Sequence, residues 1–311
     1  MISEKDVYIT AEVFTTKYLG KEDLAVKLLN LLLRNNTPYV PEKWGADGRP
    51  RYGIELNDFS PIIKEWLAPN EFKDLLFARK RPAPAEMWLD IDRFERAKFN
   101  YFNAYISDKY FKEVGQENEL LDLITDICLA TDAVYGFIVH KTQESRQSPI
   151  LTPAERLPGI YWANFFGQPY IDFFGREKLL ATPCHEVREI NENLILLLTA
   201  ESPFQPEMLE NDVIPDLIKG YLNQNAFAGP RFPDEPCEVP KFDFSDLRPR
   251  TETFVETPDQ KLSRIAAELE AKGYKLINRS GDQLTFQGRD NSIAVVELRT
   301  ESISLDLTET Q

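Results

Sequence analysis

The feature that most constrains the fold is a proline-rich stretch that interrupts the chain late in its length. Between Gly229 and Arg250 the sequence GPRFPDEPCEVPKFDFSDLRPR contains five prolines. Proline lacks the backbone N–H that a helix interior or a central strand requires, so neither element is expected to run through this stretch. The sequence therefore predicts a main domain over residues 1–225, an acidic linker or arm over residues 226–257 lying on the main body, and a small module over residues 258–311.

The main domain mixes the helical and the strand periodicity. Leucines at helical spacing between Leu24 and Leu33, and the apolar run LLDLITDICLA within residues 117–130, predict helices. DLLFARK, MWLDID and AKFNYFNAYI cluster β-branched and aromatic residues, which predicts consecutive antiparallel strands. HEVREI and NLILLLTA, separated by Asn191-Glu192-Asn193, predict a hairpin. We therefore expect an α+β fold in which a mainly antiparallel sheet is covered by helices.

Shorter segments complete this expectation. The polar residues around Trp44 to Pro50 predict a loop, and Pro206 to Asn225 predicts a helix that Pro215 bends or divides. Residues 258–311 predict one amphipathic helix, stopped at Gly273, packed on four short antiparallel strands. The remaining expected elements are strands over Val7–Lys17, Tyr52–Leu56 and Val134–His140 and a short helix over Ile62–Leu67.

Composition and charge narrow the classes of partner. The chain is 42% hydrophobic and 28% charged, no run approaches the roughly 18 apolar residues of a membrane span, and the start, MISEKDVYIT, does not resemble a secretory signal. We therefore expect a cytoplasmic protein. Its 36 Lys and Arg against 51 Asp and Glu give a net charge of −15, which repels nucleic acid and anionic membranes and favours a basic protein partner. An acidic surface that serves only solubility is the alternative.

Cysteines and histidines give no metal or redox pattern. Cys128, Cys184 and Cys237 are odd in number and far apart, so no disulfide framework or CxxC pair is expected. The chain has two histidines, His140 and His185, and the adjacent Cys184 and His185 would point to opposite faces of a strand. His140 ends an apolar run and is interpreted as a strand-edge residue. We expect no metal and no cofactor.

No catalytic signature stands out. The sequence lacks GxSxG, GxxxxGK[ST] and GxGxxG, and a Cys184–His185 dyad is not favoured by adjacency in sequence. Asp90 and Asp92 would share one face of a strand and could serve acid–base or Mg²⁺ chemistry. In a chain with 51 acids, a solvated strand face is the favoured interpretation. The sequence thus predicts no enzyme.

An aromatic motif, GIYWANFFGQPYIDFFGREKLL, runs from Gly159 to Leu180. If its first part is a strand, Tyr161, Ala163 and Phe165 share one face while Ile160, Trp162, Asn164 and Phe166 share the other; both faces are largely apolar, as in a strand buried on both sides. We therefore expect a structural role, with a ligand-stacking platform or a reaction site as alternatives. The residues of this structural motif are Gly159, Tyr161, Trp162, Asn164, Gly167 and Tyr170.

The proline-rich arm carries the candidate partner-binding residues. A stiffened, exposed arm loses little further entropy when it binds, and its acids could steer a basic partner. A solvated arm is the alternative. The candidate residues are Asp234, Glu235, Glu238, Asp243 and Asp246.

The segment AVYGFIVHK, followed by LPGIYWANFFGQPYIDFFGREKLL, resembles the immunity proteins of bacterial polymorphic-toxin and contact-dependent systems. The resemblance lies in a YG pair at Gly136 and in the spacing G-x-Y-W-x-N-x-x-G-x-x-Y from Gly159 to Tyr170, and it covers about Val7 to Asn225. It implies an α+β cytosolic protein that binds and neutralises a cognate toxin domain without catalysis. The residues alone leave a small-molecule or peptide-binding module, or an unrecognised enzyme, as alternatives.

Overall fold

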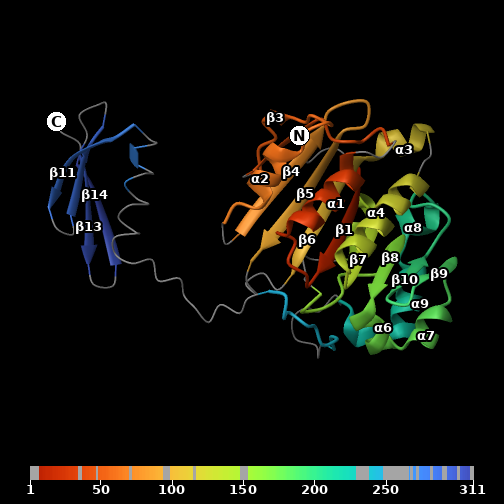
Figure 1. Cartoon of the computed structure of the whole chain (residues 1–311). Helices are drawn as coiled ribbons and strands as arrows, with labels where there is room; N and C mark the ends of the chain where they lie inside the picture. The colour runs from red at the N-terminus through yellow and green to blue at the C-terminus, as the bar shows by residue number, and fades with distance from the viewer. Residues whose placement is uncertain are drawn as a thin grey trace. The chain divides into compact units, whose positions relative to one another are not determined.

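The computed structural model describes residues 7–33, 37–46, 48–69, 72–93, 99–114, 117–147, 153–228 and 238–247, and parts of 266–308 (266, 269–270, 273–280, 283–288, 293–299 and 302–308). The chain divides into two compact units, Met1–Arg250 and Thr251–Gln311 (Figure 1). Each is described by itself.

The first unit is built on one antiparallel sheet. In its described residues ten strands are hydrogen-bonded in the order β3-β2-β4-β5-β6-β1-β7-β8-β10-β9, and each neighbouring pair is antiparallel. The predicted α+β class is confirmed. The strands are β1 (Tyr8–Thr15), β2 (Lys43–Ala46), β3 (Tyr52–Gly53), β4 (Phe72–Arg79), β5 (Ala85–Asp92), β6 (Asn100–Ser107), β7 (Tyr135–His140), β8 (Ala163–Gly167), β9 (Glu186–Asn191) and β10 (Leu194–Leu198).

Helices connect the strands and cover parts of both faces of the sheet. Apart from a short 3-10 turn over Gln224–Ala226, the helices described are α1 (Glu22–Leu33), α2 (Ser60–Trp66), α3 (Asp108–Val114), α4 (Glu117–Thr131), α5 (Lys141–Gln147), α6 (Gln168–Phe174), α7 (Arg176–Leu180), α8 (Pro206–Glu210) and α9 (Val213–Leu222). Among the described residues, no helix combines the length and apolar character needed to cross a membrane.

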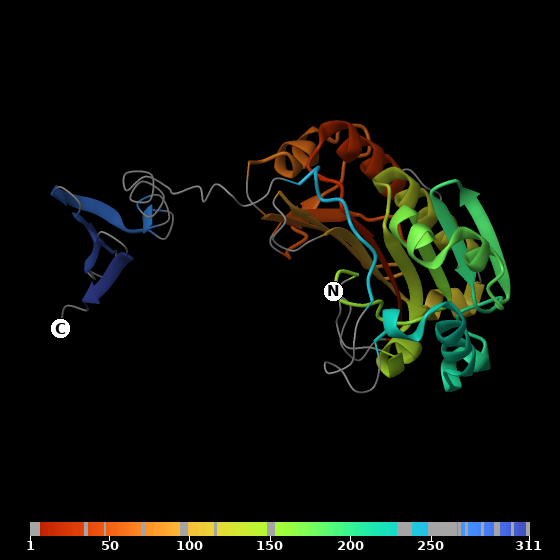
Figure 2. The same cartoon turned by 90° about the horizontal axis from the view of Figure 1, so that it is seen from below.

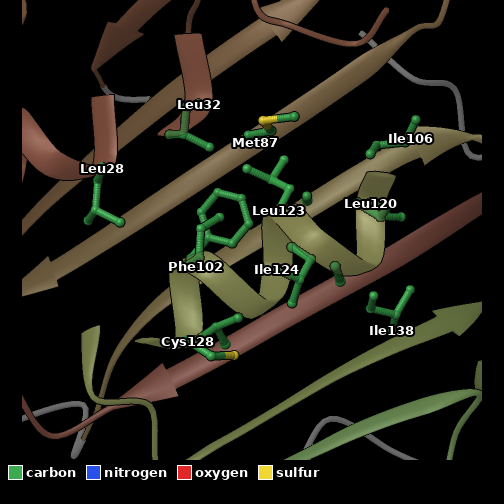
Figure 3. Packing of buried hydrophobic residues seen from close by; sticks show 14 of the residues in the cluster. Leu28, Leu32, Met87, Phe102, Ile106, Leu120, Leu123, Ile124, Cys128 and Ile138 are labelled. Atoms are coloured by element: carbon green, nitrogen blue, oxygen red, sulfur yellow. The ribbon is translucent and has the colours of Figure 1, made fainter. Parts of the chain in front are cut away.

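The first face of the sheet holds the larger core. Alternate residues of β1, such as Ile9 and Val13, point to this face and meet the apolar sides of α1 and α4. Figure 3 shows Leu28 and Leu32 of α1 and Ile124 of α4 around Phe102 of β6. Burial of this face by two amphipathic helices explains why the leucine spacing of both segments predicted helices.

The second face changes character along the sheet. Over β7, β8 and β10 it carries an aromatic core that includes Tyr135, Phe137 and Phe166, packed against residues of α6 and α9 such as Tyr170 and Ile218. Over β4, β5 and β6 the described residues place no helix on this side, whereas α1 and α2 lie on the opposite side (Figure 2). The second face is therefore divided into a covered half and a half without a helical layer.

Local departures from the predicted elements have physical causes. The loop predicted over Trp44 to Pro50 is wrong at its start, because Lys43–Ala46 pairs with β3 and β4 as a short strand despite its glycine. Residues 48–50 form a turn and loop. The helix predicted over residues 206–225 divides at Asn211-Asp212, and Pro215 lies in the first turn of α9, where its missing N–H costs nothing. The hairpin β9–β10 is confirmed.

The second unit contains an antiparallel meander in the order β11-β12-β13-β14. Leu284 and Phe286 of β12 are buried on it. The predicted helix before Gly273 lies mostly outside the described residues. The strands are β11 (Lys275–Ser280), β12 (Gln283–Gln287), β13 (Ile293–Arg299) and β14 (Ser302–Thr308).

Candidate functional site

The aromatic motif lies inside the first unit. Trp162 is 1% exposed and its indole Nε1 donates to the Ala200 carbonyl oxygen at 3.0 Å. Asn164 is fully buried, and its amide bonds both the N–H (2.9 Å) and the carbonyl oxygen (2.8 Å) of Tyr161. Tyr170 is buried and donates to the Pro153 carbonyl oxygen at 3.2 Å. The polar side-chain atoms of the motif therefore form hydrogen bonds that fix the backbone around β8.

Two glycines of the motif allow close backbone approach. A Cβ on Gly167 would lie 1.9 Å from the carbonyl oxygen of Ala133, and one on Gly159 would lie 2.5 Å from the side-chain oxygen of Gln147. The alternation predicted upstream of Ala163 is wrong because β8 begins only at that residue: Trp162 packs in the same core as Phe165.

The arm acids form bonds within the first unit. Asp234 and Glu235 lie outside the described residues. Glu238 accepts hydrogen bonds from Asn223 at 2.7 Å and Asn225 at 3.3 Å, which lower its pKa. Asp243 accepts from the Ser245 N–H at 2.9 Å. Asp246 accepts from the Tyr18 N–H at 3.0 Å and pairs with Lys21 Nζ at 2.6 Å.

The described part of the arm, residues 238–247, packs against the rest of the first unit through aromatic rings. The ring centroids of Phe242 and Phe244 lie 5.1 and 5.4 Å from that of Phe99. The arm also borders a cavity of about 430 Å³ that is lined by lysines as well as acids, among them Lys17 and Lys241. Of the predicted arm acids in the described residues, each therefore has an internal partner, and the charge around the cavity is mixed.

The part of the second face without helical cover carries a different set of side chains. On β4, β5, β6 and β1 most of the residues that alternate with the core residues are acidic, aromatic or amide-bearing. Leu76 and Thr10 lie on the same side and are fully buried. We call this surface the acidic face. Its residues are Tyr8, Glu12, Asp74, Glu86, Trp88, Asp90, Tyr101, Asn103 and Tyr105.

Strand register aligns these residues into rows across the sheet. Trp88 lies opposite Asn103, which lies opposite Glu12. In the next row Asp74, Asp90 and Tyr101 follow one another across β4, β5 and β6. Cross-strand neighbours on one face are close enough to interact. Residues far apart in sequence therefore form one surface, as Glu12 and Asn103 do at a separation of 91 positions.

Basic residues of the same strands point the other way. On β4, Lys73 pairs with Glu65 of α2, and Arg79 donates to the Val40 carbonyl oxygen at 2.7 Å. Asp74, between them in sequence, is on the acidic face. The pleat therefore separates positive from negative charge across this part of the sheet.

Burial perturbs the acids of this face. Desolvation raises the pKa of Glu12 to about 7, with a further contribution from the nearby Glu144 of α5. Desolvation also raises the pKa of Asp90 to about 6, opposed by a hydrogen bond from Tyr101 and assisted by Asp74. These carboxyl groups are held where their charge is costly, so a cation beside them would be stabilising.

Other residues considered from the sequence give no reaction site. Asp90 is 8% and Asp92 2% exposed, so the expectation that both acids are solvated is wrong. Burial raises the pKa of the Cys184 thiol to about 11, which disfavours a nucleophilic thiolate. His140 ends β7 as a buried residue with its Nε2 3.6 Å from Asp108 Oδ2. Within the described ranges, no three histidine, cysteine or acidic residues are arranged to hold a metal ion.

Comparisons with known proteins add little. No protein-family model matches the chain, and no curated protein matches it. Among solved structures it is similar to the Pseudomonas aeruginosa T6SS protein PA0821, with 10% sequence identity, a TM-score of 0.49, and coverage of 77% of this chain and 80% of that chain.

Proposed function

We propose that this protein is an immunity-type protein that binds a basic bacterial toxin domain through the acidic face and neutralises it. The acidic face is the observation that carries the proposal. It combines at least four carboxyl groups with partly exposed aromatic rings, among them Trp88 and Tyr105. Over β4, β5 and β6 the described residues place no helix on this side of the sheet. Aromatic side chains are enriched at protein interfaces, and a negative surface selects a positive one.

The net charge of −15 supports the same class of partner. Long-range attraction of this sign accelerates encounter with a basic domain and disfavours phosphate-bearing partners. The resemblance of Gly136 and Gly159–Tyr170 to immunity proteins contributes a framework for this function. Because the motif residues are buried, the contact surface is sought elsewhere, on the acidic face.

Co-expression tests the proposal. The protein encoded by the gene next to this one is expressed as the candidate toxin in a bacterium, with and without this chain, and growth is measured. We expect growth arrest by the toxin alone and recovery in the presence of the wild-type chain. Recovery should be lost in the double variant Asp74→Lys/Glu86→Lys, because both side chains are on the acidic face.

A matched double variant, Glu192→Lys/Glu207→Lys, changes the net charge equally at exposed positions of the β9–β10 turn and of α8. It should protect like wild type. Absence of recovery by the wild-type chain, together with absence of a complex between purified chain and toxin, overturns the proposed function.

A further inference from the structure

We propose that Glu12, Asn103 and Glu144 form a notch in the acidic face that receives the guanidinium group of an arginine from the partner protein. The inference rests on the proposed function for the identity of that partner, and it adds the chemical group that is recognised. Asn103 Oδ1, at the centre of the face, is a buried polar atom without a hydrogen-bond partner among the described residues.

Asn103 occupies the middle of the row between Trp88 and Glu12. It is 7% exposed, and its Nδ2 donates to Glu12 Oε1 at 3.0 Å and to the Tyr105 hydroxyl at 3.1 Å. Its Oδ1 is buried and has no hydrogen-bond partner among the described residues. Buried acceptors are normally bonded, so this oxygen could accept a hydrogen bond from a donor that a ligand would bring.

Glu144 supplies a second acceptor from α5, at the border of the same face. Its Oε2 is buried without a hydrogen bond among the described residues, although Lys141 Nζ lies 3.6 Å away. Burial raises the pKa of Glu144, and Glu144 in turn raises that of Glu12. Glu12 is thus disfavoured as an anion by Glu144 and is bonded to Asn103, whose amide oxygen is unpaired among the described residues. These acceptors are ones that a cationic donor would satisfy.

The surroundings favour a guanidinium over an ammonium. A guanidinium presents five donors in one plane and stacks on aromatic rings, so it can bond several acceptors while Tyr101 or Tyr105 contacts its face. The site at the border suited to an ammonium is already taken, because Lys141 Nζ lies 5.1 Å above the ring of Tyr8 and beside Glu144. The acceptors and aromatic rings of the notch therefore suit the planar donors of an arginine side chain better than the ammonium of a lysine.

The test uses small probes on the full chain. N-acetyl-arginine amide is titrated into ¹⁵N-labelled protein, and the resonances of the Asn103 side-chain amide and the Trp88 indole are followed. Trp88 is opposite Asn103 in the β5–β6 register, so it reports on the same spot. We expect both resonances to shift saturably, with a dissociation constant of about millimolar strength for so small a ligand.

Two comparisons make the result specific. N-acetyl-citrulline amide has nearly the same shape without the charge, and N-acetyl-lysine amide has the charge without the planar set of donors. Both should bind at least about tenfold more weakly than the arginine probe. Glu12→Gln, which preserves shape, should weaken binding of the arginine probe about tenfold, and so should Glu144→Gln. The control Glu207→Gln, on the exposed part of α8, should leave binding unchanged.

Equal binding of the arginine and citrulline probes, or unchanged binding in both Glu12→Gln and Glu144→Gln, overturns the notch. Lysine binding as tight as arginine binding overturns the assignment of a guanidinium. The two proposals fail separately: a chain that neutralises its toxin but ignores the arginine probe loses the notch alone. A chain that binds the probe but never the toxin loses the proposed function alone.

Discussion

The two halves of the second face belong to one continuous sheet, but they differ in their side chains and in the helices that cover them. Over β7, β8 and β10 the face carries Tyr135, Phe137 and Phe166 and is covered by α6, by α9 and by connecting segments of the same chain. Over β4, β5 and β6 it carries Trp88, Asp90 and partly exposed tyrosines, and the described residues place no helix there. β1 belongs to both halves.

The transition takes place between two residues of β1. Phe14 is opposite Tyr135 on one side and Tyr101 on the other, and its ring centroid lies 6.5 Å from that of Tyr135 and 6.0 Å from that of Tyr101. Glu12, two positions earlier on the same face, is bonded to Asn103. The aromatic motif that is most conspicuous in the sequence therefore packs in the core. The acidic face is formed by strands with less conspicuous sequences, such as β5 and β6.

The largest expected effect separates two tryptophans, one from each region. Trp162→Ala should lower the free energy of unfolding by about 3–5 kcal/mol, because it empties a fully buried site and removes the bond to Ala200. Trp88→Ala, at a half-buried position, should cost less than half as much. Urea denaturation measures both. A stable Trp162→Ala variant that loses toxin binding would invert the comparison.

The pH dependence of stability isolates Glu12. Its folded pKa of about 7 lies above the ordinary 4.5, so ionisation is penalised in the folded state. Its contribution to stability is intact below about pH 4.5 and is lost as the pH rises towards 7. At about 1.4 kcal/mol per pKa unit, the loss has an upper bound of about 3.5 kcal/mol. The titratable groups that interact with Glu12 are Glu144 of α5, Tyr101 and Tyr105 of β6, Tyr135 of β7, and Tyr161.

Glu12→Gln should therefore be more stable than wild type by a margin that grows between about pH 4.5 and 7 and is constant above it. Denaturation curves at a series of pH values provide the measurement. A margin independent of pH, or one that shrinks as the pH rises, would show that Glu12 is not buried as described.

A smaller effect is expected at the turn that closes the covered half. Gly167→Ala should destabilise the protein by about 1–3 kcal/mol, because the new Cβ would meet the Ala133 carbonyl at 1.9 Å. Gly53→Ala is the control, since nothing lies within 4 Å of a Cβ there. If thermal unfolding of the two variants coincides, the close approach of β8 to residue 133 is not required.

The smallest effect is expected from the arm. Replacing Glu238, Asp243 and Asp246 by their amides should change toxin association at low salt by less than about threefold, because the proposed contact surface is the acidic face and not the arm. Stopped-flow association kinetics measure this. A slowing that matches that of the Asp74→Lys/Glu86→Lys variant would move the contact surface from the acidic face to the arm.

Sequence reasoning reached the fold class because the longest elements have strong periodicity: the leucines of α1 and the apolar run of α4 match their buried sides. It missed β2, since a four-residue strand containing Gly45 has too little pattern to distinguish from a loop. It missed α5 for a related reason, because KTQESRQ is polar throughout and Gln143 is its buried residue.

The candidate site was less accessible to sequence reasoning. The sequence indicates Asp90 as a candidate acid, but the burial and the neighbours of Asp90 depend on which strands pair and in which register. Glu12 and Asn103 are 91 residues apart and meet only because β1 pairs with β6. A pairing of this kind has no local signal, whereas the alternation within each strand does.

The most direct test of the account compares the affinity of the purified toxin domain for three forms of the chain: wild type, Asp74→Lys/Glu86→Lys on the acidic face, and Glu192→Lys/Glu207→Lys as the charge-matched control. Measured by titration calorimetry at about 0.15 M salt, where exposed charges beyond about 8 Å are screened, the acidic-face variant should bind about a hundredfold more weakly and the control within about threefold of wild type. Equal affinity for the wild-type chain and the acidic-face variant would contradict the claim that the acidic face is the contact surface.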